Sequence, residues 1–145
     1  MEKNLKKIAV LFFVAVATIV FNSSWINMHK DAPYEKIIKD YYGAYEKKDW
    51  NLMESLLADG FTFTSPNNDD HIDIKKFKEK CWPGAYKIKK FDVAKIIGSG
   101  DEAYATYTCT TVDGKLFRNT EYYKFKDGKI AEIEVFFGTG INFPK

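Results

Sequence analysis

Residues 117–137, FRNTEYYKFKDGKIAEIEVFF, contain two runs of alternating side chains that meet at Asp127-Gly128. An Asp-Gly pair between two such runs is a strong signal for a β-hairpin. The stretch therefore predicts two antiparallel strands. The length of the loop between them decides which side chains share a face.

Charge selects the register of this hairpin. A two-residue loop places Glu121 opposite Glu134, and like charges in directly opposed positions destabilise a strand pair. A three-residue loop, Lys126-Asp127-Gly128, places Glu121 opposite Ile133 instead. We therefore expect the three-residue loop, with Glu132 and Glu134 on the solvated face.

The preceding hairpin extends the same pattern. A three-residue loop at Val112-Asp113-Gly114 aligns Tyr107 with Asn119 and Cys109 with Phe117. One carboxylate, Glu121, then lies on an apolar face, where it either finds hydrogen-bond donors or stays protonated with a raised pKa. The alternative is an edge position open to water. The register places Tyr107, Asn119, Glu121, Tyr123 and Phe137 inside, and Arg118, Lys124, Glu132 and Glu134 outside.

Upstream of the hairpins the periodicity is helical. Apolar residues recur every three or four positions from Ala32 for about four turns, and a short helix at Trp50–Ala58 follows the predicted cap Asp49. A short strand covers 61–65, and a third helix follows Asp73 with a hydrophobic staple. Strands are expected at about 86–97, 102–111, 115–125 and 129–137. Helices followed by a strand meander predict an α+β fold.

The first residues resemble a secretory signal. Lys3, Lys6 and Lys7 precede an uncharged apolar run at 8–21, which is short for a membrane span. We assign 1–24 as a signal peptide, 25–31 as a linker and 32–145 as one domain. The expected location is exported, either periplasmic or secreted, with an uncleaved membrane tether as the alternative. No integral membrane segment is expected in the mature chain.

Composition and net charge exclude some classes of binding partner. The chain of 145 residues carries 22 basic and 20 acidic residues, and its net charge of +2 matches the excess in the first seven residues. Without the first seven residues the chain is neutral and lacks the charge expected for nucleic-acid binding. Aromatic residues form 17% of the chain, which suggests a lined cavity. Cys81 and Cys109 are expected to be free thiols, and the histidines offer no metal site.

Three segments carry a resemblance to a known family. They are Lys48-Asp49-Trp50 through Leu57-Ala58-Asp59-Gly60-Phe61, the strand end Ser65-Pro66, and the stretch 117–138. Over about 32 to 138 the chain resembles the nuclear-transport-factor-2-like superfamily, including its SnoaL-like and ketosteroid-isomerase-like members. The resemblance implies three N-terminal helices packed on a curved antiparallel sheet, forming a cone with an internal pocket.

The resemblance also assigns site residues. Tyr41 stands eight residues before Asp49, as does the oxyanion-hole tyrosine of the ketosteroid isomerases, and Glu121 stands four before Phe125, where they carry a protonated acid. Their general base immediately precedes a proline, and here that position holds Ser65. The related polyketide cyclases use a carboxylate on a later strand, a role open to Glu121.

A replacement base is available in Asp70-His71, because an imidazole titrates near neutral pH and a carboxylate orients it. The competing interpretation is a solvated loop before a helix N-terminus, where acidic residues are favoured. The catalytic candidates are thus Glu121, Tyr41, His71 and Asp70. The ligand-binding candidates are Phe61, Phe63, Ser65, Tyr107, Asn119, Tyr123 and Phe137.

Three functions remain open from the sequence. The first is an exported domain that binds a small, largely apolar molecule with a carbonyl or hydroxyl group, with weak or no catalysis. The second is a cofactor-free lyase, isomerase or cyclase that uses Glu121 and Tyr41. The third is an interaction module without a ligand. A homodimer through the outer sheet face is a further expectation.

Overall fold

The computed structural model describes residues 33–137, which belong to one compact unit, Ala32–Lys145. The predicted signal peptide at 1–24 and linker at 25–31 lie outside the described residues. Within 33–137, none of the helices has the length and apolar character that a membrane span requires.

The described residues confirm the α+β order and add two short elements. Strand β2 and the 3-10 helix η2 fall where the sequence predicted a loop and the end of a helix. In chain order the elements are α2 (Pro33–Lys47), α3 (Trp50–Leu56), β1 (Leu57–Ser65), β2 (Asp69–Ile72), α4 (Ile74–Lys80), η2 (Trp82–Lys87), β3 (Ile88–Ser99), β4 (Glu102–Thr111), β5 (Leu116–Lys126) and β6 (Lys129–Phe136).

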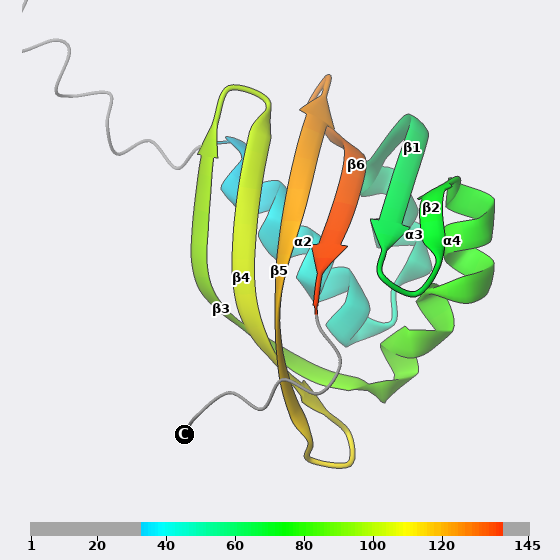
Figure 1. Cartoon of the computed structure of the whole chain (residues 1–145), viewed down its shortest axis with the longest axis vertical. Coiled ribbons are helices and arrows are strands. Elements are labelled where there is room, and N and C mark those ends of the chain that lie inside the picture. Colours follow the sequence, from blue (N-terminus) through cyan, green and yellow to red (C-terminus); the bar gives the residue numbers. More distant parts are fainter. Residues whose placement is uncertain (1–32, 138–145) are drawn as a thin grey trace, which may run out of the picture. The chain divides into compact units, whose positions relative to one another are not determined.

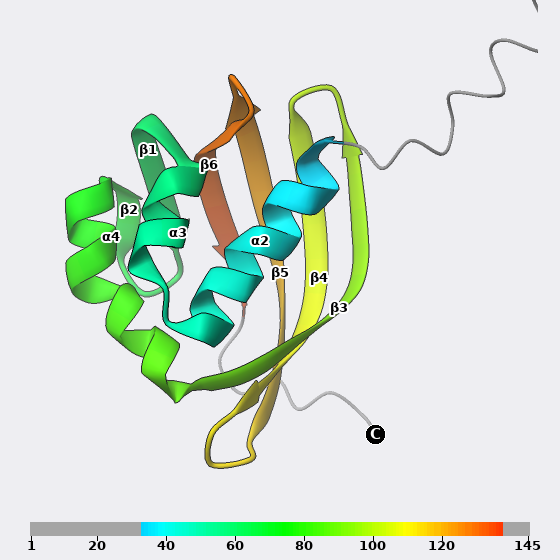
Figure 2. The same cartoon turned by 180° about the vertical axis from the view of Figure 1, so that it is seen from behind.

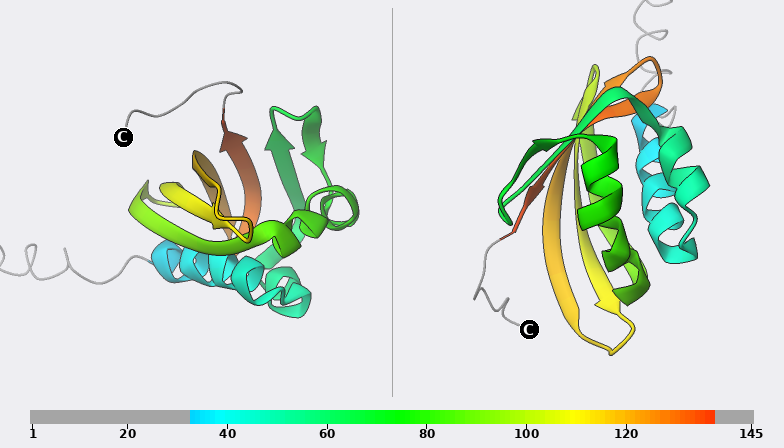
Figure 3. Two further views of the ribbon diagram at one scale, coloured as in Figure 1. Left: turned by 90° about the horizontal axis from the view of Figure 1, so that it is seen from below. Right: turned by 90° about the vertical axis from the view of Figure 1, so that its right-hand side faces the viewer.

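The strands form one six-stranded sheet in the order β2-β1-β6-β5-β4-β3. All neighbours are antiparallel except β1 and β6, which are parallel, so the prediction of a wholly antiparallel sheet is wrong for this pair. The sheet is curved but not closed, and α2 crosses its inner face (Figures 1 and 2). Seen from below, α2 and α3 form a helical layer against the sheet (Figure 3).

Two predicted caps define where helices begin. The carboxylate of Asp49 accepts a hydrogen bond of 3.0 Å from the backbone N–H of Leu52 at the start of α3. The carboxylate of Asp73 accepts one of 2.8 Å from Lys76 at the start of α4. Each cap satisfies a backbone donor that has no partner within its own helix.

The hairpin between β4 and β5 has the predicted register. Tyr107 pairs with Asn119 and Cys109 with Phe117 across a three-residue loop, in which Gly114 has a φ of 83°. This register turns the side chains of Tyr107 and Asn119 toward the same interior.

The hairpin between β5 and β6 corrects the prediction. Its loop has two residues, because Lys126 pairs with Lys129 and both Asp127 (φ 52°) and Gly128 (φ 74°) are left-handed. A bulge at Ala131 then restores the predicted faces, because Lys124 pairs with Glu132 and Glu121 with Val135. The charge argument therefore chose the right faces, and the chain reaches them through a bulge instead of a longer loop.

Two glycines test this reading of the backbone. Gly128 needs its positive φ, so we expect Gly128→Ala to lower the free energy of unfolding by about 1 kcal/mol. Gly43 lies inside α2 with nothing within 4 Å of an added Cβ, so Gly43→Ala should raise it by about 0.5–1 kcal/mol. Urea denaturation of both variants measures these changes. Equal effects of the two substitutions would contradict the assignment of the turn.

Candidate functional site

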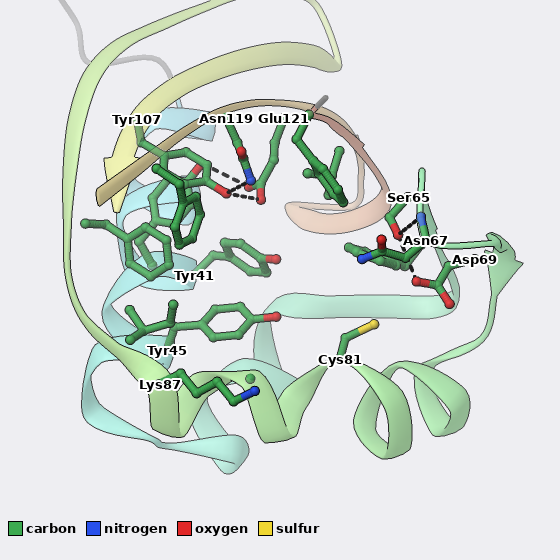
Figure 4. Close-up of a pocket in the computed structure, with 18 of the residues that line it drawn as sticks. Tyr41, Tyr45, Ser65, Asn67, Asp69, Cys81, Lys87, Tyr107, Asn119 and Glu121 are labelled. Carbon is green, nitrogen blue, oxygen red and sulfur yellow. Dashed lines mark hydrogen bonds between the residues drawn. The ribbon is translucent and has the colours of Figure 1, made fainter. Parts of the chain in front are cut away.

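A pocket of about 520 Å³ opens between the inner face of the sheet, α2 and η2. This volume lies within the range of small-molecule sites. Aromatic and aliphatic side chains form much of its wall, and polar groups are added at two places, one around Glu121 and one around Asp69 (Figure 4). The apolar part of the wall includes Phe63, Ile88, Phe91, Phe117, Val135 and Phe137.

Glu121 is buried at one side of this pocket and is surrounded by tyrosine hydroxyls. Its side chain lies on β5, and the residue is only 5% exposed. Tyr107 of β4 donates a hydrogen bond of 2.9 Å to Oε1, and Tyr42 of α2 donates one of 3.0 Å to Oε2. Tyr123, two residues along β5, hydrogen-bonds to Oε2 and also approaches the hydroxyl of Tyr42 at 2.9 Å. Asn119 donates to the hydroxyl of Tyr107 at 3.2 Å.

The number of hydrogens in this network favours a protonated Glu121. The oxygens Tyr42 Oη, Tyr123 Oη and Glu121 Oε2 make three mutual contacts, but the two tyrosines supply two hydrogens. The Tyr107 hydrogen is directed to Oε1 instead. A proton on Oε2 closes the triangle, and each of its three oxygens then donates once and accepts once.

The burial of Glu121 also favours its protonated form. It raises the pKa of Glu121, and the hydrogen bonds from Tyr123, Tyr107 and Tyr42 oppose that rise only in part. Burial also raises the pKa of Tyr42 and Tyr107, with a further increase from the nearby Glu121, so these tyrosines stay neutral donors.

The structure corrects the expected partner of Glu121. The helix α2 brings Tyr42 to the carboxyl, whereas the neighbouring Tyr41 packs edge-on against Tyr42, Tyr45 and Tyr123. Tyr41 and Tyr45 direct their hydroxyl groups into the pocket, as Figure 4 shows. Tyr41 is therefore available to a ligand, while Tyr42 belongs to the Glu121 network.

A second polar cluster lies across the pocket from Glu121, where Figure 4 shows Ser65 and Asp69. Lys80 also lines the pocket and belongs to this cluster. Ser65 donates a hydrogen bond of 2.8 Å to the buried carboxylate of Asp69, and Lys80 of α4 forms an ion pair with it. Burial opposes ionisation of Asp69, but the hydrogen bonds from Lys80 and Ser65 and the charge of Lys80 prevail, so its pKa is lowered. Asp69 is thus an ionised and weakly basic carboxylate.

The proposed replacement base does not reach the pocket. His71 lies on β2 with its side chain 61% exposed, and its Nδ1 is 2.5 Å from Asp70. Its Nε2 is 3.7 Å from Glu132 on the outer face of the sheet. The hydrogen bond and charge of Asp70 raise the pKa of His71. The alternative interpretation, a solvated position, describes both His71 and Asp70.

The remaining candidates divide between the pocket wall and the core. Phe61 and Tyr123 are buried behind the wall, Phe61 against Phe77 and Tyr123 against Tyr41. On the pocket wall lie Phe63, Ser65, Tyr107, Asn119 and Phe137, and their binding of a ligand stays a prediction.

Sequence reasoning missed five of the polar residues that line the pocket, Tyr42, Tyr45, Asp69, Lys80 and Lys87. Tyr42 differs from Tyr41 by one helical position, which periodicity alone does not resolve. Asp69 could have been found from its pairing with Ser65 across the β1–β2 turn. This pairing was not predicted, because the segment of β2 was expected to be a loop. Lys80 and Lys87 belong to no sequence motif that would have indicated a site. In 33–137 no cluster of His, Cys, Asp and Glu side chains is suited to bind a metal ion, and both cysteines are free.

The buried carboxyl predicts a specific pH dependence of stability. With its folded pKa raised above the unfolded value of about 4.3, Glu121 stabilises the chain fully below that pH. This contribution declines by about 1.4 kcal/mol per pH unit as pH rises toward the folded pKa. Glutamine does not titrate, and its amide nitrogen can face Tyr42 and Tyr123. We therefore expect the stability of Glu121→Gln relative to wild type to increase with pH above 5.

A truncating variant is the control for this prediction. Glu121→Ala removes the acceptor of Tyr107 and of one hydroxyl of the Tyr42–Tyr123 pair, and should cost about 3 kcal/mol or more at pH 5. Relative to wild type this cost should decline as pH rises, because alanine does not titrate. Thermal unfolding of the three proteins from pH 5 to 8 measures both effects. The titration of His71 is common to all of them and cancels in the differences. Parallel pH profiles for wild type and Glu121→Gln would show that Glu121 is ionised.

Comparison with known proteins identifies the family of the chain. Residues 38–133 match the SnoaL-like domain. A nuclear-transport-factor-2-like protein of unknown function from Cytophaga hutchinsonii is 20% identical, with a TM-score of 0.59 over 77% of this chain and 95% of that one.

Two further structures carry proposed activities. A proposed ketosteroid isomerase from Kribbella flavida is 16% identical, with a TM-score of 0.61 over 78% of this chain and 83% of that one. A proposed polyketide cyclase from Sinorhizobium meliloti is 17% identical, with a TM-score of 0.58 over 72% and 98%. These identities support a shared fold. No curated protein sequence matches the chain.

Proposed function

Since the chain belongs to the SnoaL-like domain family of the nuclear-transport-factor-2-like superfamily, we propose that it binds a small, largely apolar molecule in its pocket, with weak or no catalysis. One observation carries this proposal: an open pocket of about 520 Å³ with aromatic walls and inward-directed hydroxyls of Tyr41 and Tyr45. Such donors suit a carbonyl or hydroxyl group on the ligand.

The charged groups of the pocket favour binding over proton abstraction. Ser65 occupies the position of the expected base and cannot accept the proton. Asp69 is ionised, but Lys80 and Ser65 lower its pKa and so weaken it as a base. Glu121 has both oxygens engaged by tyrosines. A ligand in the pocket would thus find hydrogen-bond donors, whereas none of Ser65, Asp69 and Glu121 would act as a strong base toward it.

An acid–base enzyme is the second candidate, and the raised pKa of Glu121 favours it. In this function Glu121 would give its proton to a ligand carbonyl and take one back, which requires the carboxyl to leave its tyrosine partners. A lyase, isomerase or cyclase of this kind needs no cofactor. Loss of turnover in Glu121→Gln, with ligand affinity retained, would identify it.

A docking module without a ligand is weakly supported, because the interior holds an open pocket. A homodimer through the outer sheet face stays a prediction. Exposed Tyr104 and Phe136 lie on that face, and sedimentation equilibrium measures the association.

Modification of Cys81 provides a test of ligand binding. Cys81 lines the pocket, and burial raises the pKa of its thiol to about 11, whereas Cys109 is fully buried. We expect a methanethiosulfonate reagent at mildly alkaline pH, where 2-naphthol is still neutral, to modify Cys81 alone, and 2-naphthol in the pocket to slow this reaction. Tyr45→Phe should weaken protection by 2-naphthol about five- to tenfold, because it removes one inward hydroxyl.

The matched control is Tyr104→Phe, which removes a hydroxyl from the outer face and should leave protection unchanged. If neither 2-naphthol nor other aromatic alcohols and ketones protected Cys81 at any concentration, the binding proposal would fail.

Export is a separate proposal that rests on the first residues of the chain. Lys3, Lys6 and Lys7 before the apolar run 8–21 support cleavage near residue 24. Fractionation of the source cells with intact-mass measurement should find the shortened chain outside the cytoplasm. The full-length chain in a membrane fraction would favour the uncleaved tether, and the full-length chain in the cytosol would contradict export.

A further inference from the structure

The charges on the pocket wall do not cancel. Four ionisable acidic or basic side chains line it, namely Glu121, Asp69, Lys80 and Lys87. Asp69 and Lys80 neutralise each other in an ion pair, and the hydrogen count above favours a neutral Glu121. None of the ion pairs among residues 33–137 includes Lys87. The wall therefore keeps one positive charge, on Lys87.

The backbone fixes where Lys87 stands. It is the last residue of η2, and its carbonyl accepts a hydrogen bond of 2.9 Å from the N–H of Val112 at the tip of the β4–β5 hairpin. The next residue, Ile88, is buried in the pocket wall. Figure 4 shows the Lys87 side chain extending along the pocket edge on the same side as Tyr45. Lys87 is exposed and lines the pocket, so its ammonium group lies at the border between the apolar wall and water.

The surrounding segment adds to this positive potential. Residues 74–90 contain seven lysines and one glutamate, and of these lysines Lys80 pairs with Asp69 and Lys90 with Asp92. The other described residues contain ten basic and seventeen acidic side chains. This cluster of lysines is not visible in the net charge of the chain and was not recognised from the sequence. Clustered charge of one sign beside a cleft raises the local concentration of oppositely charged ligands.

We propose that the pocket takes an anionic amphiphile, a molecule with a carboxylate or similar acid on an aromatic or aliphatic body, and that Lys87 binds the acid group at the mouth. The body of the ligand then packs among the aromatic rings. The hydroxyl of Tyr45 lies on the same side of the pocket as the acid group, and the far end of the ligand meets the hydroxyl of Tyr41 and the amide of Asn119, all of which can donate hydrogen bonds. This inference rests on the proposed ligand-binding function and specifies the class of ligand.

Two probes that share the naphthalene ring and differ in charge test whether the pocket prefers an anion. We would measure binding of 2-naphthoate and of the neutral 2-naphthamide to the full chain, with protection of Cys81 as the readout. Wild type should bind 2-naphthoate at least fivefold more tightly than 2-naphthamide. Lys87→Gln should remove this preference by weakening 2-naphthoate about five- to twentyfold and leaving 2-naphthamide unchanged. Added NaCl should weaken only the anion.

Lys89→Gln is the control, because it changes the net charge equally and Lys89 is exposed and outside the pocket wall. It should change 2-naphthoate affinity less than twofold. Equal effects of the two substitutions, or equal affinity of wild type for both probes, would overturn the inference while the binding function stood. If neither probe bound to wild type, the binding function itself would fail for this class of molecule.

Discussion

The buried carboxyl of Glu121 is the constraint on which this domain depends. A carboxyl group in an apolar interior is costly unless each of its oxygens has a partner. Tyr42 brings α2 to it, Tyr107 brings β4, and Tyr123 lies beside it on β5. The same four side chains therefore fix the helix against the curved sheet and form one side of the pocket.

The network also determines which groups remain for a ligand. Because Glu121 is satisfied by its own neighbours, the donors that face the pocket are the hydroxyls of Tyr41 and Tyr45, which also interact with each other, and the second amide hydrogen of Asn119, whose first is given to Tyr107. Across the pocket, Asp69 is held by Ser65 and Lys80. Such satisfied networks make a wall rigid. This organisation supports the proposal that the site holds a molecule with weak or no catalysis.

Sequence reasoning reached the faces of the strands because alternation and charge are local properties. It placed Glu121 and Tyr107 inside correctly, although the chain uses a bulge at Ala131 instead of the predicted three-residue loop. It failed where the deciding contact is distant. The choice of Tyr42 over Tyr41 depends on how α2 is rotated against the sheet, and Asp69 reaches the pocket only because β2 pairs with β1.

The central claim is that the pocket is occupied by a small molecule in the source cells. Native mass spectrometry of the chain purified from those cells, compared with the same protein after denaturation, tests it most directly. We predict an additional non-covalent mass of a few hundred daltons that denaturation removes and that a Tyr45→Phe, Lys87→Gln double variant retains poorly. A chain that carries no additional mass under any gentle purification would contradict the account.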